Sequence, residues 1–357
     1  MSRTKLKEAT RIVVKLGTGI LTDSQNRPDT RQLRSLVRQV ATLMAQGREV
    51  MLVSSGAVGA GMGRLGIEKR PTDLAQLRAC AAAGQAQLMN AYDRLFAAEG
   101  LKTAQVLLTH EDLRHHERHL NARDTLVTLL GHGVVPIINE NDTVSCTELK
   151  FGDNDRLSAL VACLVPADAL VILTSVDGVI RNFGEENEEL LREVDKIDSS
   201  LVRSAKGTMS DTATGGMSAK IEAARIVMRS GIPLVIAPGR KKKVLQEVFE
   251  GDGIGTLFQA SDSKLKGRKR WIAFFHHPKG VLSVDEGAKE ALRKNGKSLL
   301  LPGIRKVTGT FSKGDVVSIC DMDGTEFARG MAEWSSKTVK GGRRSSIIVH
   351  RNNLVIL

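Results

Sequence analysis

The sequence predicts an α/β fold in which a mainly parallel sheet lies between two layers of helices (an αβα sandwich), followed by a small, mostly β domain. Over the first two thirds, short apolar runs alternate with segments of helical period, as in parallel sheets buried on both faces. After Phe258 the pattern changes to short β-like runs joined by glycine-containing turns. The charge changes as well: residues 240–357 carry 23 Lys and Arg against 12 Asp and Glu, whereas residues 1–239 carry 29 against 28.

The expected strands are short runs rich in β-branched residues, and the expected helices carry apolar residues three or four positions apart. Strands are predicted at 11–16, 49–53, 104–108, 134–138, 169–174 and 233–237. Helices are predicted over about 33–46, 73–98, 121–130, 155–164 and 217–229. In such a sheet, ligands bind at the carboxyl ends of the strands.

A chain of 357 residues exceeds one ordinary hydrophobic core. We predict a first domain over 1–260, a linker over 261–270 and a second domain over 271–357. The longest apolar stretch is interrupted by Pro166 and Asp168, so it predicts no membrane-spanning helix. Scattered cysteines without C-x-x-C spacing, together with the lack of a signal-peptide pattern, favour a cytoplasmic protein.

Three glycine-rich segments are candidates for phosphate binding. Lys15 ends the first strand in VVKLGTGIL, SSGAVGAGMG follows the second strand, and TGGMSAK leads into the last helix of the alternating region. Glycine lets backbone N–H groups approach an anion, and a helix N-terminus attracts phosphate. None of the three is a Walker A motif, and each alone is also ordinary turn chemistry. Together with Lys15 and Lys220, they indicate phosphoryl transfer by positioning and charge neutralisation.

A dense polar loop lies between two apolar runs, in INENDTVSCTELKFGDND. Its acidic and amide residues are Asn139, Glu140, Asn141, Asp142, Asp153, Asn154 and Asp155. The loop lacks the ligand spacing of an EF-hand, and helix capping by Asp153 or Asn154 accounts for only some of these groups. We predict that Asp142 pairs with the ammonium of an amino acid, that Asn154 hydrogen-bonds its carboxylate, and that Asp155 orients a catalytic lysine.

The motifs VVKLGT, SSGAVGAG, HLNARDT, INENDTV, FGDNDRLSAL and ATGGMSAK, in this order, resemble those of the glutamate 5-kinases of the amino acid kinase family. The later segment SLLLPGIRKVTGTFSKGDVV resembles the C-terminal PUA domain of these enzymes. The resemblance covers essentially the whole chain. It implies ATP-dependent phosphorylation of the γ-carboxylate of L-glutamate to γ-glutamyl phosphate, the first step of proline biosynthesis.

The resemblance also implies roles for single residues. Lys15 and Lys220 neutralise charge on the transferring phosphoryl group, and Asp155 organises the two lysines. Substrate contacts are implied at Ser55, Asp142 and Asn154. ATP contacts are implied at Lys15, Gly17, Thr174, Ser175, Thr214, Gly215, Gly216, Met217, Ser218, Ala219 and Lys220. Magnesium is expected on the ATP oxygens, without a protein metal site.

The chain departs from the family pattern after the strand at 169–174. Ser175 stands where the family often has aspartate, and Ile180 where it often has tyrosine, which leaves the nucleotide preference open. The alternatives are a kinase for another small acid, such as N-acetylglutamate or aspartate, and an RNA-binding or regulatory protein with an inactive kinase fold. An N-acetylated substrate would leave Asp142 facing an amide.

Further expectations concern partners. A homo-oligomer and channelling to glutamate-5-semialdehyde dehydrogenase are implied by the resemblance. RNA binding by the basic C-terminal domain is not favoured, because only 3% of residues are aromatic and stacking platforms are scarce. His115 and His119 have a spacing that suits metal binding on a helix, although a solvated helical face explains this charged stretch better.

Overall fold

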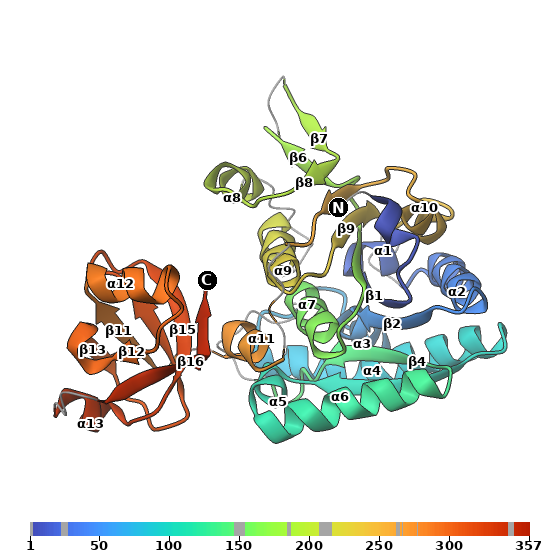
Figure 1. Cartoon of the computed structure of the whole chain (residues 1–357). Coiled ribbons are helices and arrows are strands. Elements are labelled where there is room, and N and C mark those ends of the chain that lie inside the picture. The colour runs from blue at the N-terminus through green and yellow to red at the C-terminus, as the bar shows by residue number, and fades with distance from the viewer. Residues whose placement is uncertain are drawn as a thin grey trace. The chain divides into compact units, whose positions relative to one another are not determined.

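The structure, a computed structural model, describes residues 3–22, 28–145, 154–183, 187–206, 216–261, 265, 267–276, 278–341 and 346–357. The chain divides into two compact units, Met1–Lys264 and Leu265–Leu357 (Figure 1). Residues 267–270, within the predicted linker, form the start of helix α11 (Gly267–Phe274) of the second unit. Among the described residues, no helix is both long enough and apolar enough to cross a membrane.

The first unit is built on one eight-stranded sheet, in the order β3-β4-β2-β1-β5-β9-β10-β8. Every neighbouring pair is parallel except β9 and β10. This confirms the predicted mainly parallel sheet. The strands are β1 (Arg11–Leu16), β2 (Glu49–Ser54), β3 (Lys102–Leu108), β4 (Val134–Glu140), β5 (Ala169–Thr174), β8 (Glu193–Val194), β9 (Leu234–Pro238) and β10 (Thr256–Phe258). A separate hairpin pairs β6 (Val179–Arg181) with β7 (Glu189–Leu191).

Helices cover both faces of this sheet. They are α1 (Thr18–Leu21), α2 (Thr30–Ala45), α3 (Ala57–Leu65), α4 (Leu74–Ala97), α5 (His110–Arg114), α6 (His116–Gly131), α7 (Asn154–Leu164), α8 (Ser199–Lys206), α9 (Met217–Arg229) and α10 (Val244–Glu250), with the short 3-10 helix η1 (Arg3–Leu6) near the start. The side chains of β1 alternate between faces: Ile12 and Val14 join the core under α2 and α10, and Val13 is buried on the opposite face. The five predicted helices and six predicted strands are all present.

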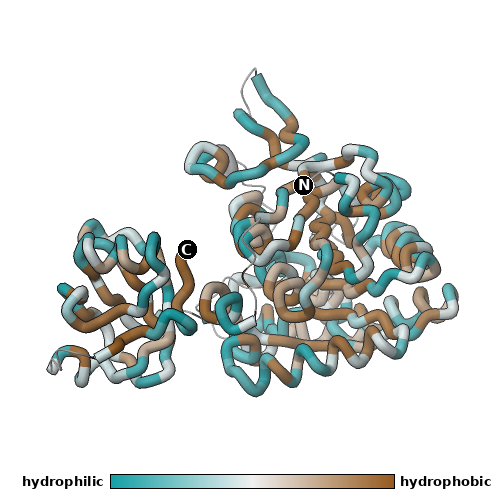
Figure 2. Tube along the Cα trace, in the orientation of Figure 1, coloured by the Kyte–Doolittle hydropathy of each residue, from teal (hydrophilic) through white to brown (hydrophobic). Residues whose placement is uncertain are grey.

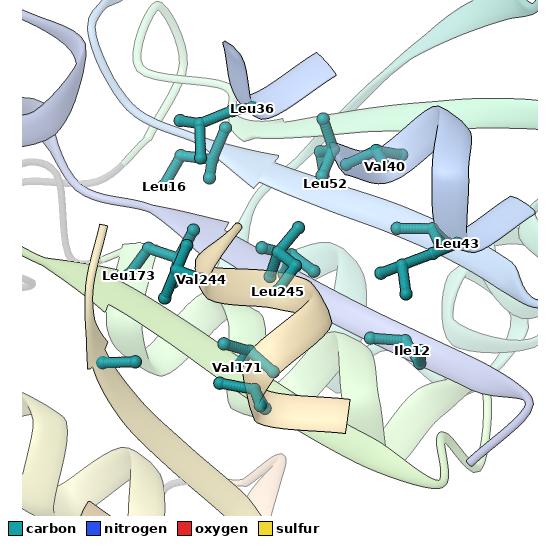
Figure 3. Packing of buried hydrophobic residues seen from close by; sticks show 14 of the residues in the cluster. Ile12, Leu16, Leu36, Val40, Leu43, Leu52, Val171, Leu173, Val244 and Leu245 are labelled. Atoms are coloured by element: carbon teal, nitrogen blue, oxygen red, sulfur yellow. The ribbon is translucent and has the colours of Figure 1, made fainter. Parts of the chain in front are cut away.

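The core under α2 and α10 forms because apolar side chains recur with the period of each element. Figure 3 shows this packing, in which α2 and α10 cover β1, β2 and β5. The labelled side chains are Ile12, Leu16, Leu36, Val40, Leu43, Leu52, Val171, Leu173, Val244 and Leu245. Burying one such side chain stabilises the fold by about 1.5–3 kcal/mol. In Figure 2 apolar residues run along the central strands, whereas the covering helices are mixed.

Helix α3 corrects the prediction of a glycine loop after β2. Only Gly56 has a left-handed backbone there, with φ 107°, and the chain is helical from Ala57 onward. Two further glycines allow α3 and α4 to pack with their backbones in contact. A Cβ on Gly61 would lie 1.8 Å from the carbonyl oxygen of Cys80, and one on Gly84 would lie 1.9 Å from that of Ala57.

The second unit is mostly β, as predicted. Its six-stranded sheet has the order β12-β16-β15-β14-β11-β13 and encloses a core of its own. The strands are β11 (Gly280–Val284), β12 (Leu299–Leu300), β13 (Ile304–Gly309), β14 (Val316–Cys320), β15 (Glu326–Ala332) and β16 (Ile347–Ile356). The helical elements beside α11 are α12 (Glu286–Arg293), α13 (Ser336–Lys340) and the 3-10 turn η2 (Leu301–Gly303).

Candidate active site

The carboxyl ends of β1 and β2 bring the first candidate residues together. In the parallel register, Lys15 is opposite Val53 and Leu16 is opposite Ser54. The backbone N–H of Ser55 donates to the carbonyl oxygen of Leu16, at 3.2 Å. Ser55 therefore lies beside the turn that follows Lys15, at the edge of the sheet where a ligand site was predicted.

Lys15 and Lys220 share one carboxylate. The Nζ atom of Lys15 lies 2.7 Å from Oδ1 of Asp155, and Nζ of Lys220 lies 3.0 Å from Oδ2. The three side chains come from β1, α9 and α7, and all are buried, with Asp155 only 1% exposed. Burial by itself would raise the pKa of Asp155, but the two lysines outweigh it and hold that pKa below its usual value. The carboxylate is therefore ionised, and the group of three carries a net positive charge.

Two of the predicted ATP segments lie at helix N-termini. Gly17 is the N-cap of α1 and Gly216 is the N-cap of α9, and neither end has a side-chain cap. A Cβ on Gly17 would lie 3.6 Å from Nζ of Lys15, so the turn lies directly beside the lysine, and it would meet the carbonyl oxygen of Leu173 at a tight 3.3 Å. Met217, Ser218 and Ala219 form the first turn of α9. The N–H of Ala219 donates to the carbonyl oxygen of Gly216 at 3.1 Å, and the N–H groups that precede it suit an anion.

The remaining residues predicted to contact ATP differ in burial, and two of them lie outside the described residues. Thr174 ends β5 and is buried, whereas Ser175 is exposed. A Cβ on Gly19 of α1 would lie 3.8 Å from Oγ of Ser175, which places Ser175 beside the turn after Lys15. Thr214 and Gly215 lie outside the described residues.

Asn154 precedes Asp155 in α7 and joins a buried amide network. Its Nδ2 donates to Oδ1 of Asn139 and to Oγ of Ser55, both at 3.0 Å. Nδ2 of Asn139 donates in turn to Oε1 of Gln85, at 2.9 Å. Asn154 is 3% exposed, yet its Oδ1 has no hydrogen-bond partner among the described residues. The available atom is thus an acceptor, whereas the sequence-based hypothesis used the amide N–H groups to bind a carboxylate.

Asp142 supplies a second unpaired acceptor. It is 8% exposed, and its Oδ1 has no hydrogen-bond partner in the part of the chain that the structure describes. Burial, together with the nearby charge of Glu140, raises the pKa of Asp142 to about 7, although Arg70 acts in the opposite direction. A buried oxygen without a partner is costly, so this geometry favours a ligand that carries hydrogen-bond donors and positive charge.

Asp142 and Asn154 face the same small cleft. The residues that line it are Thr18, Ser55, Gly56, Ala57, Val58, Gly59, Arg70, Asn139, Asp142 and Asn154. All three predicted substrate residues are among them. Thr18 of the cleft follows Gly17, and a Cβ on Gly17 would lie 3.6 Å from Nζ of Lys15, so the cleft adjoins the end of the site that holds the lysines.

Comparison with known proteins assigns the family. The model of the amino acid kinase family matches residues 10–238, and the PUA domain model matches residues 280–351. The chain belongs to the amino acid kinase family. The glutamate 5-kinase of Citrifermentans bemidjiense is 44% identical, with 100% of both chains covered. Those of Moorella thermoacetica and Myxococcus xanthus are each 44% identical, covering 99% of this chain and 98% of the relative. The predicted resemblance is confirmed.

Solved structures of other amino acid kinases share the fold. The UMP kinase of Bacillus anthracis has a TM-score of 0.50 and 17% identity, covering 72% of this chain and 99% of that structure. The carbamate kinase of Giardia lamblia, bound to AMP-PNP, has a TM-score of 0.52 and 17% identity, covering 71% and 100%. At this identity the likeness concerns the fold alone.

Sequence reasoning missed some residues of this amino acid kinase site. Gln85 holds Asn139, and Tyr92 forms a buried hydrogen bond with Ser54, with 2.6 Å between Oη and Oγ. Gln85 and Tyr92 are seven residues apart on α4, so they share one face, and this spacing is a signal that the sequence contains. Arg70 follows α3 with no periodic signal, and only the folded chain shows that it lines the cleft.

The predicted histidine pair does not form on one helix. His115 has extended backbone angles between α5 and α6, so it lies outside both helices. The Nδ1 atom of His119 lies 3.1 Å from the carbonyl oxygen of Leu113. Across the described residues of this amino acid kinase, no three or more His, Cys, Asp or Glu side chains group closely enough to hold a metal ion.

The second unit of this amino acid kinase contains a cavity of about 710 Å³ between α12 and the β12 edge. Apolar residues such as Leu292 and Leu299 line it together with the cations Lys297 and Arg351. RNA binding by this domain stays a prediction.

Proposed function

We propose that the protein is a glutamate 5-kinase, which transfers the γ-phosphoryl group of ATP to the γ-carboxylate of L-glutamate. The product is γ-glutamyl phosphate, and the reaction is the first step of proline biosynthesis. The observation that supports the proposal is that two features adjoin. The buried ionic group of Lys15, Asp155 and Lys220 lies next to a cleft in which Oδ1 of Asp142 and Oδ1 of Asn154 have no hydrogen-bond partner among the described residues. Relatives of that name, similar over the whole chain, support it.

The chemistry needs positive charge more than a base. An oxygen of the γ-carboxylate attacks the γ-phosphorus, the bond to the β,γ-bridging oxygen breaks, and ADP leaves. The attacking carboxylate is already ionised at neutral pH, so no proton must be removed. Lys15 and Lys220 neutralise negative charge on the phosphoryl oxygens while the phosphoryl group is transferred. Asp155, whose lowered pKa makes it a poor base, holds the two lysines.

The cleft favours a free amino acid over an acylated one. The α-ammonium of L-glutamate can donate to Oδ1 of Asp142 and Oδ1 of Asn154, two buried acceptors of cleft-lining residues that have no hydrogen-bond partner among the described residues. An N-acetyl group offers one N–H and no positive charge, so it leaves buried acceptors unsatisfied. Aspartate is one methylene shorter, so it cannot hold this ammonium contact and also extend its side-chain carboxylate as far toward the lysines.

ATP is proposed to bind with its phosphates at the N-termini of α1 and α9, near Thr174 and Ser175. Magnesium is proposed to be carried on the ATP oxygens. A cytoplasmic location, predicted from the cysteine pattern and the lack of a signal-peptide pattern, remains a proposal. A homo-oligomer and channelling to glutamate-5-semialdehyde dehydrogenase, implied by the resemblance, remain proposals as well. The alternative of an RNA-binding protein with an inactive kinase fold is disfavoured, because such a protein would not need the buried Lys15–Asp155–Lys220 group.

A coupled assay of ADP release tests the proposal. MgATP is supplied with L-glutamate, N-acetyl-L-glutamate or L-aspartate, and hydroxylamine traps any acyl phosphate as a hydroxamate. We expect turnover and a γ-hydroxamate with L-glutamate, and at least tenfold lower kcat/KM with the other two acids. Hydroxamate formed from N-acetylglutamate in preference would assign the cleft to an acylated substrate. Absence of turnover with all three would exclude the kinase assignment.

A further inference from the structure

L-Glutamate carries three charged groups, and the site described above accounts for two of them. The γ-carboxylate must face Lys15 and Lys220, since it receives the phosphoryl group. The α-ammonium matches the unpaired oxygens of Asp142 and Asn154. The α-carboxylate is bonded to the same carbon as the ammonium, so it must lie in the same cleft and needs donors of its own.

The amide nitrogens of the two asparagines that line the cleft already donate to protein atoms. Nδ2 of Asn154 donates to Ser55 and Asn139, and Nδ2 of Asn139 donates to Gln85. Burying a carboxylate among acceptors alone is strongly unfavourable. The hydroxyl groups of Thr18 and Ser55 can each donate one hydrogen bond but carry no charge, so a cation that lines the cleft is the stronger partner for this carboxylate.

Among the described residues that line the cleft, Arg70 is the single cation. It is exposed and forms neither a hydrogen bond nor an ion pair with any residue that the structure describes. It is close enough to Asp142 to act electrostatically on that carboxyl group. A guanidinium presents several N–H donors in one plane, which matches the two oxygens of a carboxylate.

The first turn of α3 lines the same cleft. Gly56 begins the helix without a side-chain cap, and Ala57, Val58 and Gly59 follow. The first N–H groups of a helix have no partner within it, and the helix dipole favours an anion. Nearly buried Asn154, with an unpaired Oδ1 in the same cleft, independently indicates that a ligand binds here.

The fold holds Arg70 at this position by the turn between α3 and α4. Helix α3 ends at Leu65, its C-cap Gly66 has a left-handed φ of 68°, and the N–H of Ile67 donates to the carbonyl oxygen of Met62 at 2.9 Å. The backbone contact of α3 with α4 at Gly61 limits movement of both helices. The segment that carries Arg70 is thus tied at both ends to rigid elements.

We propose that Arg70, together with the N–H groups of the first turn of α3, binds the α-carboxylate of L-glutamate and selects substrates with a free α-carboxylate. The inference rests on the proposed glutamate kinase function and adds a specificity residue to it. Arg70 acts on binding and not on phosphoryl transfer, because the γ-carboxylate lies at the lysine end of the site.

The test compares two acceptors in the full-length protein: L-glutamate and L-isoglutamine, in which the α-carboxylate is a carboxamide. For Arg70→Ala we expect a 10- to 30-fold rise in the KM for L-glutamate, the loss expected for a charge-assisted hydrogen bond, with kcat changed less than threefold. The KM for L-isoglutamine should change less than threefold. If the amide is not turned over, its inhibition constant replaces the KM. Arg70→Lys should keep part of the preference for L-glutamate.

Lys69→Ala is the matched control, since Lys69 is an exposed neighbouring cation that does not line the cleft. Its kcat and its KM values for L-glutamate and L-isoglutamine should equal those of the unmodified protein. Equal losses for both acceptors in Arg70→Ala, or no loss for either, would overturn the inference while leaving the kinase function intact. A fall in kcat alone would place Arg70 at the phosphoryl group and would overturn it too. If the unmodified protein does not phosphorylate L-glutamate, the proposed function itself fails.

Discussion

Nζ of Lys15 and Oδ1 of Asp155 lie 2.7 Å apart, and Lys220 contacts the other oxygen of the same carboxylate. Two lysines thus share a single carboxylate, so these three side chains together carry one excess positive charge. The excess positive charge is stable only because Asp155 remains ionised between them. It provides an electrostatic site for a transferring phosphoryl group before any substrate binds.

Replacing Lys220 should reduce the chemical step more than substrate binding. For Lys220→Ala we expect kcat to fall by at least about 100-fold and the KM for L-glutamate to change less than about threefold, since the charge matters most in the transition state. Steady-state kinetics with MgATP measure both. Arg225→Ala is the control on α9, because Arg225 pairs with Glu222 in a half-exposed ion pair. A change confined to KM would contradict the assigned role.

Asp155 should be important for stability as well as activity. Asp155→Asn removes the carboxylate and leaves two lysines buried without it, and losing one partner of a buried pair costs about 3–5 kcal/mol. Urea denaturation of the first unit measures the difference. Glu222→Gln, which breaks an exposed pair, should cost under about 1 kcal/mol. Similar losses in the free energy of unfolding for the two variants would show that the Lys15–Asp155–Lys220 group stabilises the protein no more than a surface ion pair does.

The affinity for L-glutamate should depend on pH near neutrality. The raised pKa of Asp142, about 7, means that the free protein carries a protonated Asp142 below that pH. A neutral carboxyl group does not attract an ammonium. We therefore expect kcat/KM for L-glutamate to rise with pH through about 7 and then to level off, whereas the KM for ATP stays nearly constant.

Asp142→Asn is the control for this pH profile. It should raise the KM for L-glutamate, leave ATP affinity nearly unchanged and remove the rise near pH 7. A raised carboxyl pKa means that the folded state binds this proton more tightly than the unfolded state does. The contribution of Asp142 therefore lowers the free energy of unfolding of the protein as the pH rises toward 7. Asp142→Asn should therefore be more stable than the unmodified protein at pH 8, and the difference should shrink below pH 4. An unchanged pH profile would remove Asp142 from the ammonium site.

The contact of α3 with α4 gives a steric prediction. Gly61→Ala places a Cβ 1.8 Å from the carbonyl oxygen of Cys80, so the helices must separate. We expect a loss of about 1–3 kcal/mol in stability and a higher KM for L-glutamate, because α3 lines the cleft. Gly63→Ala, on the same helix with open space around it, should be neutral or stabilising by about 0.5–1 kcal/mol. Thermal unfolding and glutamate kinetics distinguish the two variants.

Removal of the second unit should leave a folded kinase. The two units have separate hydrophobic cores, and the division falls between Lys264 and Leu265. A chain of residues 1–264 should unfold cooperatively and retain kcat for L-glutamate within about tenfold. Cutting near residue 270 is a poorer choice, because it divides α11. An insoluble or inactive fragment would show that the first unit depends on the second.

Local sequence patterns predicted much of the fold. The apolar runs at β1, β2, β4, β5 and β9 predicted a parallel sheet, and apolar spacing predicted both ends of α2, α4 and α9 to within three residues. Helix α3 was missed because its sequence, AVGAGMGRL, is rich in glycine, which disfavours helices in isolation. The packing of Gly61 against α4 overrides that preference, and this contact depends on residues outside the helix itself.

The sequence alone determined the type of fold, the place of the site at the strand ends, and the lysines, Asp142, Asn154 and Asp155 as its polar groups. These follow from period, residue chemistry and motif, which are local properties of the chain. Only the tertiary structure decided which of their atoms remain available. Nδ2 of Asn154 is used by Ser55 and Asn139, its Oδ1 is not, and Arg70 lines the same cleft. The reason is physical: hydrogen-bond capacity is shared among atoms that meet only when distant segments fold together.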